Sequence, residues 1–80
     1  MSIDVSPNDL MAKAREEAFE TLSLVQHYAE CAKLHLQIGD DTGTIWDLQN
    51  FADAARRAIR AFSPVRQAMI DRGKQSEAAE

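Results

Sequence analysis

The sequence has little proline, glycine or cysteine. Only two Pro and three Gly occur among 80 residues, of which 45% are apolar, and this composition favours long helices over turns or disorder. The single cysteine, Cys31, excludes an internal disulfide, so the fold must be held together by packing. Positive charge is also scarce, because nine basic side chains stand against 13 acidic ones for a net charge of −4. This balance argues against bulk attraction to nucleic acid or to an anionic membrane.

Long hydrophobic runs are missing as well. The sequence contains no run of 18 apolar residues, and Met1 to Asp4 lack the basic and apolar regions of a signal peptide. We therefore expect neither a membrane span nor a leader, which makes the cytoplasm the default location. A chain of 80 residues supports one domain with a small core. A second copy or a partner is therefore expected to contribute to its stability.

The few helix breakers mark the ends of a long first helix. Ser6 is placed to cap the free amides of the first turn, and Pro7 suits the first helical position. The next breaker is Gly39, a residue typical of the position just after a helix. The spacing predicts a helix over about 7–38, followed by a polar loop at 39–43.

A second helix is expected to begin at Thr44, which can cap it, and to cover about 44–62. Pro64 then removes a helical hydrogen bond, so it predicts either a sharp kink or the start of a new short helix. That third helix is expected over about 64–72, ending near a glycine. The remaining residues, 73–80, are expected to form a frayed tail.

Apolar residues recur at alternating spacings of three and four on both long helices, the pattern of a coiled-coil seam. On the second helix these residues are Ile45, Leu48, Ala52, Ala55, Ile59 and Phe62. On the first helix they are Met11, Ala18, Leu22, Val25, Ala29, Ala32 and Leu36. Two long helices joined by a short loop must lie antiparallel. The sequence therefore predicts an all-α protein built on a helical hairpin that closes along these two seams.

The first helix also carries a second apolar stripe with a spacing of seven residues. Its members are Leu10, Leu24, Cys31 and Ile38. Both stripes together cover an arc of about 200°, roughly twice what one partner helix buries. Because the third helix is expected to be short, we expect two hairpins to form a homodimeric four-helix bundle with these four residues at the dimer interface. Cover by the third helix or by a different protein is the alternative.

Three potential zinc ligands, His27, Cys31 and His35, follow one another at a spacing of four on the first helix. The two histidines are about 12 Å apart along the axis, so at most two of the three groups can hold one ion. The chain has no other Cys or His. We therefore expect no metal and no cofactor. We also expect no enzyme activity, because no nucleophile has a general base placed beside it.

Positive charge is concentrated between residues 54 and 74, where six basic side chains accompany one acidic one. One interpretation is that these bases pair with the glutamates of the first helix, Glu16, Glu17 and Glu20. The alternatives are an acidic protein partner and a nucleic-acid backbone. The side chains predicted to contact a partner are Trp46, Arg56, Arg57, Arg60 and Arg66.

Trp46 lies off the expected seam of the second helix, one turn from the loop. It either folds over Leu34 and Ile38 at the end of the hairpin or stays exposed as an interface anchor. These features predict a non-catalytic interaction protein that binds and modulates a larger protein or ribonucleoprotein complex. One concrete version is a phage or mobile-element inhibitor of host machinery, of the anti-CRISPR type. Binding of nucleic acid through residues 56–74 is the alternative.

Overall fold

Three helices make up the part of the chain that the computed structural model describes, residues 7–79. They are α1 (Pro7–Gln37), α2 (Asp41–Ala61) and α3 (Ser63–Ala79), and no strand occurs in this range. The expectation of an all-α protein is confirmed. Ser6, the expected cap of the first helix, lies outside the described residues. None of the described helices is long and apolar enough to cross a membrane.

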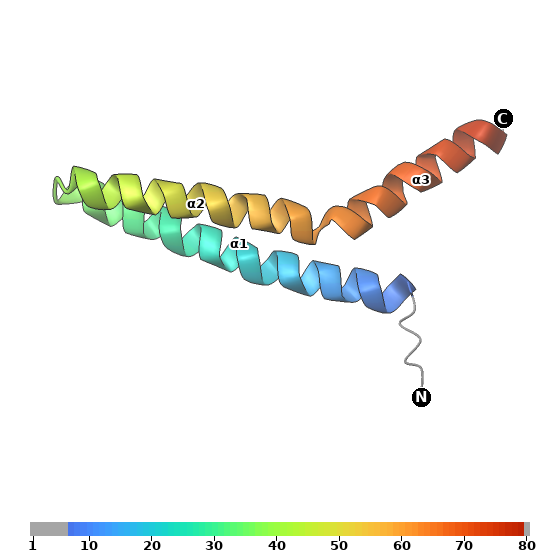
Figure 1. The fold of residues 1–80 in the computed structure, drawn as a ribbon, viewed down its shortest axis with the longest axis horizontal. Helices are drawn as coiled ribbons and strands as arrows, with labels where there is room; N and C mark the ends of the chain where they lie inside the picture. Colours follow the sequence, from blue (N-terminus) through green and yellow to red (C-terminus); the bar gives the residue numbers. More distant parts are fainter. Residues whose placement is uncertain (1–6, 80) are drawn as a thin grey trace.

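Helices α1 and α2 lie side by side and run in opposite directions, whereas α3 leaves the pair at an angle (Figure 1). The shape is therefore flat and open, with principal extents of 57, 40 and 13 Å. The radius of gyration is 18.1 Å, against about 11.6 Å for a compact domain of this length. So open a shape leaves much of each helix in contact with solvent.

The turn between α1 and α2 is shorter than the expected loop at 39–43. Gly39 adopts the left-handed φ of +74° that follows a helix C-terminus. Asp40, and not Thr44, caps α2, because its side chain accepts a hydrogen bond of 2.9 Å from the backbone N–H of Gly43. Helix α2 consequently begins at Asp41, one turn earlier than the sequence predicted.

The chain bends at Phe62, between α2 and α3. The carbonyl of Phe62 accepts hydrogen bonds of 3.1 Å from the N–H groups of Val65 and Arg66, so a new helix starts there. Pro64 is in its first turn, where a missing N–H costs nothing. Helix α3 is longer than the expected 64–72 and continues through Gly73 to Ala79.

The expectation of a frayed tail at 73–80 is wrong for the residues up to Ala79, which are helical, and Glu80 lies outside the described residues. Glycine inside a helix costs only about 1 kcal/mol relative to alanine, so Gly73 does not end α3. Lys74 and the residues after it are mostly good helix formers. With 17 residues α3 is long enough to cover an apolar stripe, but it turns away from the pair instead of covering it (Figure 1).

The helix pair closes along a seam of small side chains, not along the large apolar residues. Among the described residues, the buried ones are Ala14, Ala18 and Ala32 on α1, Thr44, Asp47, Ala54 and Ala58 on α2, and Val65 in the first turn of α3. These positions, with partly buried neighbours such as Val25 and Phe51, again alternate by three and four but in a different phase. Of the expected seam on α2, Ile45, Leu48 and Ile59 are exposed by 58%, 53% and 65%. The predicted seam of α2 is therefore wrong.

The small size of the seam residues explains why these positions, and not the large apolar ones, face the other helix. Alanine and threonine allow two helix axes to approach toward the lower end of the usual 8–10 Å range. Ile45 or Ile59 at the contact would push the axes apart. On α1 the seam keeps Ala18 and Ala32 but excludes Leu22 and Leu36, which are 53% and 62% exposed. The prediction of the seam from the largest apolar side chains therefore chose the wrong face of each helix as the interior.

Adding volume at the seam tests this packing. Ala54 is 2% exposed, so Ala54→Leu is expected to lower the free energy of unfolding by about 1–3 kcal/mol through overpacking. Ala12 is exposed on α1, and Ala12→Leu serves as the control, with a change within about 0.5 kcal/mol. Urea unfolding followed by circular dichroism measures both. Equal effects of the two substitutions would contradict the proposed packing.

Candidate functional site

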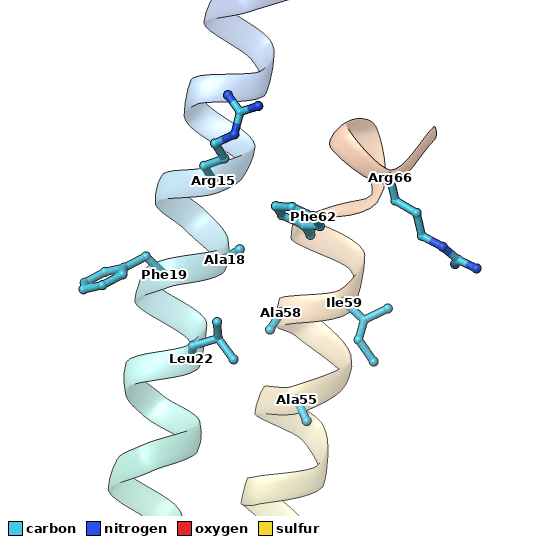
Figure 2. Close-up of a pocket in the computed structure, with 9 residues that line it drawn as sticks. All are labelled: Arg15, Ala18, Phe19, Leu22, Ala55, Ala58, Ile59, Phe62 and Arg66. Carbon is cyan, nitrogen blue, oxygen red and sulfur yellow. The ribbon is translucent and has the colours of Figure 1, made fainter. Parts of the chain in front are cut away.

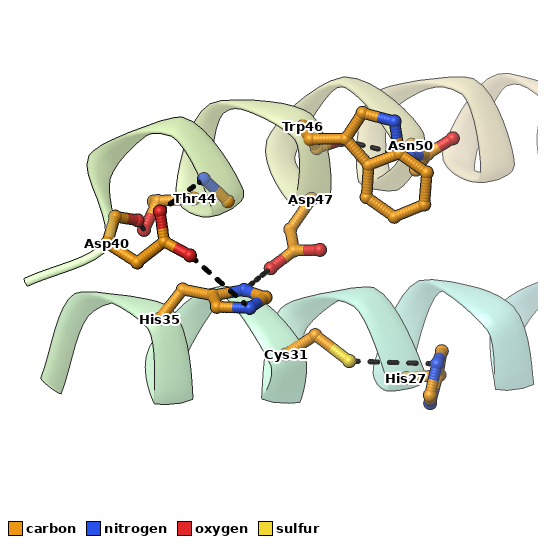
Figure 3. A network of polar contacts seen from close by, with 9 residues as sticks. His27, Cys31, His35, Asp40, Thr44, Trp46, Asp47 and Asn50 are labelled. Atoms are coloured by element: carbon orange, nitrogen blue, oxygen red, sulfur yellow. Dashed lines mark hydrogen bonds and ion pairs between the residues drawn. The ribbon is translucent and has the colours of Figure 1, made fainter. Parts of the chain in front are cut away.

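His35 of α1 and Asp47 of α2 form the polar contact that joins the two helices near the turn (Figure 3). Asp47 is 2% exposed, and its carboxylate pairs with Nδ1 of His35. Nε2 of the same imidazole lies 3.9 Å from Oδ2 of Asp40. The imidazole therefore stands between two carboxylates, one buried and one partly exposed.

The backbone around the turn is built closely against this imidazole. A Cβ added to Gly43 would lie 2.6 Å from Oδ2 of Asp40 and 3.0 Å from Cδ2 of His35, so any larger residue there would displace the capping carboxylate. The hydroxyl of Thr44 donates a 2.8 Å hydrogen bond to the carbonyl of Asp40. Asp40 is thus held by the first turn of α2 while its side chain faces His35.

The pKa of His35 is raised above its ordinary value of 6.5. The largest cause is the hydrogen bond to Asp47, and the negative charges of Asp47 and Asp40 add to it, while desolvation opposes them. The protonated imidazole is therefore favoured in the folded chain. Such a pair can carry a proton, but the described residues place no Ser, Cys or Thr hydroxyl or thiol in contact with the imidazole.

The expected ridge of His27, Cys31 and His35 is divided by this contact. His35 is engaged with α2, whereas Sγ of Cys31 lies 3.6 Å from Nε2 of His27 on the side of α1 (Figure 3). Within the described residues no three His, Cys, Asp or Glu side chains are placed to hold one metal ion. Cys31 is partly buried, near one imidazole and not between two.

Large apolar side chains collect on one face of the helix pair, which we call the apolar face. Its members are Phe19, Leu22, Leu36, Ile45, Leu48, Ile59 and Phe62. Figure 2 shows four of them lining a groove of about 640 Å³ between α1 and α2, with Arg15 and Arg66 at its open end. The other three are two heptads away from members of this group, so they share the face. All seven are more than a third exposed.

The four residues predicted for the dimer interface lie on the opposite flank of α1. Leu10 and Ile38 are exposed by 52% and 76%, and Leu24 by 37%, whereas Cys31 is only partly exposed. Glu17 occupies the heptad position between Leu10 and Leu24 and lines a polar groove with Arg57 and Arg60. This flank is therefore less apolar than the face across the seam, and whether it forms a dimer interface stays a prediction.

The residues predicted to contact a partner do not form one cluster. Trp46, Arg57 and Arg60 share one side of α2, by helical phase. Arg56 is turned further outward and makes an ion pair of 2.7 Å with Asp53. Arg66 belongs to the open end of the apolar face.

Trp46 is 59% exposed and contacts Tyr28 edge-on, with ring centroids 6.3 Å apart. It therefore packs against Tyr28 in the middle of α1 and not over Leu34 and Ile38, the first of the two placements that the sequence left open. Its carbonyl accepts a hydrogen bond of 3.0 Å from the side chain of Asn50 (Figure 3). One edge of the indole is fixed, and most of its surface remains open to solvent.

The expected pairing between the basic segment and the glutamates of α1 is absent from the described residues. No ion pair there joins Arg57, Arg60 or Arg66 to Glu17 or Glu20, and none includes Glu16. The groove between Arg57, Arg60 and these glutamates leaves the charges near one another without contact. The guanidinium groups are consequently available to another molecule.

Comparisons with known proteins give no relative from which a role could be transferred. The chain matches no protein-family model, no characterised protein and no solved structure. The site must therefore be interpreted from its own geometry.

The sequence interpretation missed the His35–Asp47 pair and Phe19. The signal for the pair was present, because His35 and Asp47 both continue the alternation of three and four set by the small residues. A polar residue in such a phase predicts a partner across the seam. Phe19, 73% exposed, lies outside either apolar stripe of the sequence and becomes meaningful only beside Ile59 and Leu22.

The raised pKa of His35 predicts a pH-dependent stability. Because the folded chain binds the proton more tightly, this stabilisation is complete below the unfolded pKa of 6.5 and is lost as pH rises through the higher folded pKa. The difference in free energy of unfolding between wild type and His35→Gln should therefore be larger at pH 5.5 than at pH 8.5. Urea titrations at both values measure it.

His27→Gln is the matched control, since His27 is exposed and lies against Cys31 and the ring of Tyr28 on its own helix. Its difference from wild type should be the same at both pH values. A pH-independent effect of His35→Gln would show that protonation of this imidazole does not stabilise the helix pair.

Proposed function

We propose that this protein is a non-catalytic interaction protein of the cytoplasm, in which the hairpin of α1 and α2 presents a binding surface for a larger protein. One observation carries the proposal. Arg57 and Arg60 are exposed beside a polar groove on the same side of α2 as the exposed Trp46. Neither arginine takes part in an ion pair among the described residues.

The chemistry of these groups defines the partner. Trp46 and Arg57 are about 16 Å apart along α2, and Arg60 follows one turn later. Tryptophan and arginine are the residues most enriched at interface hot spots, and a guanidinium binds a carboxylate through two parallel hydrogen bonds. This surface suits a protein segment that has an apolar residue for the indole and carboxylates for the two arginines.

A protein surface suits these arginines better than a nucleic-acid backbone does. Glu17 and Glu20 form the opposite wall of the groove that Arg57 and Arg60 line. Their charges repel a polyanion that approaches the groove, and the net charge of −4 adds to this repulsion. A protein partner can meet the glutamates with its own basic groups.

Charge reversal on this surface tests the proposal. Arg57→Glu with Arg60→Glu, and separately Trp46→Ala, should each weaken binding of the same partner by about tenfold or more, in line with hot-spot energies. Binding is measured by affinity capture from cells of the source organism with quantitative mass spectrometry, before and after nuclease treatment. Lys13→Glu with Arg72→Glu is the control with the same change of charge.

Two outcomes contradict the proposal. Partners that bind wild type and both test variants equally would show that this surface is unused. Loss of capture after nuclease treatment, with wild-type binding to DNA or RNA in a gel shift at about 0.15 M salt, would favour the nucleic-acid alternative, because phosphate contacts depend steeply on salt.

A further inference from the structure

The apolar face lies across the seam from the side of α2 that carries Trp46, Arg57 and Arg60, and the proposed partner leaves it uncovered. The geometry points to a second copy of this chain as its occupant, related by a two-fold axis that places the two turns at opposite ends of the dimer. This inference goes beyond partner binding. The two surfaces share no residue, so either proposal can fail while the other holds.

The exposed area fits an interface of this kind. The chain presents an accessible surface of 6531 Å², whereas a compact monomer of the same mass presents about 4800 Å². The excess of roughly 1700 Å² exceeds the share of about 800 Å² that each partner contributes to a standard interface. Seven large apolar side chains of this open chain lie on the apolar face, each more than a third exposed, so packing this face against its copy buries the kind of surface that forms an interface core.

The apolar face of α2 has the same order of side-chain sizes from either end. Ile45 and Phe62 are equally distant from its midpoint, next to Asp53, and so are Leu48 and Ile59. A two-fold axis across this midpoint sets α2 antiparallel to α2 of the second copy. Ile45 then faces Phe62 of the second copy, and Leu48 faces Ile59. Apolar side chains thus face apolar side chains along the row, and the interface removes both from water.

The same two-fold axis also pairs the residues at the centre and at the two ends of the α2–α2 contact. Ala52 faces Ala55 of the second copy at the centre, so the two small side chains of each row also meet each other. At each end Asp41, the first residue of α2, comes near Arg66 of the second copy, which lies just beyond the bend, in the first turn of α3. Opposite charges thus close both ends of the interface.

The charges also decide the direction of the second copy. Arg15 and Arg66 both line the open end of the groove. In the alternative dimer both α1–α2 turns lie at the same end, and α1 of one copy packs against α2 of the other. Arg15 of one copy would then face Arg66 of the other copy. In the antiparallel dimer the open end instead covers the turn end of the other copy, which carries Asp40 and Asp41. Like charges are separated and opposite charges meet.

The mass of the protein in solution gives the first test. Light scattering at micromolar concentration should give twice the chain mass of 8.9 kDa. Ile59→Glu on the apolar face should give the monomer mass, whereas Leu24→Glu on the opposite flank should leave the dimer intact. A monomeric wild type would overturn the inference. Dissociation by Leu24→Glu and not by Ile59→Glu would instead place the interface on the flank of Leu10 and Ile38.

A charge exchange keeps the inference testable if Ile59→Glu does not fold. Asp41→Arg alone brings arginine against Arg66, and Arg66→Asp alone brings two aspartates together, so each variant should dimerise about tenfold more weakly at low salt. Mixing the two variants restores both opposite-charge pairs in the heterodimer. The mixture should therefore associate about as tightly as wild type. Association of the mixture no tighter than either variant alone would overturn this pairing.

The direction is measured with spin labels at Thr42, which is exposed in the first turn of α2. Thr42→Cys is made together with Cys31→Ser, so that each copy holds one label. The antiparallel dimer separates the two labelled positions by about 35 Å along the axis. A distance shorter than about 25 Å would place the two turns at the same end and overturn the proposed direction.

Discussion

The close approach of α1 and α2 along small side chains determines how every other residue is used. Because alanines and a threonine occupy most of the buried positions, the two helix axes can lie near each other, and few large side chains fit between them. Leucine, isoleucine and phenylalanine are thereby displaced to the flanks of the pair. The short distance between the helix axes and the exposure of the large apolar side chains therefore have the same cause.

The one buried charged group in this interior fixes how the helices are aligned. Asp47 reaches its imidazole only when α1 and α2 face each other in the observed alignment. A slip by one heptad would keep small side chains in the seam, but it would bring Asp47 next to Tyr28 and leave a buried carboxylate without its partner. An unpaired buried charge costs several kcal/mol. The pair therefore selects one alignment among several that alanine alone would accept.

Local signals in the sequence were sufficient to predict where the helices begin and end. They were insufficient to predict which face of each helix is buried. Pro7, Gly39 and Pro64 act on the backbone of their own neighbours, so the ends of α1 and the bend could be predicted within a few residues. Which face of α2 turns inward depends on the distance between two axes. Two sets of residues on α2 share the same alternation of three and four, and size favoured the wrong one. A stripe of alanines gives a weak hydrophobic signal even where it forms the contact.

The composition of the buried seam has a calorimetric consequence. Unfolding raises the heat capacity in proportion to the apolar surface that it exposes, by about 1.0–1.2 kcal/mol/K for an average protein of 80 residues. Among the described residues, the apolar side chains that are fully buried are five alanines and one valine, which expose little such surface. Unfolding of a single copy therefore has a small heat-capacity change, and its stability varies less steeply with temperature than that of a typical domain of this size.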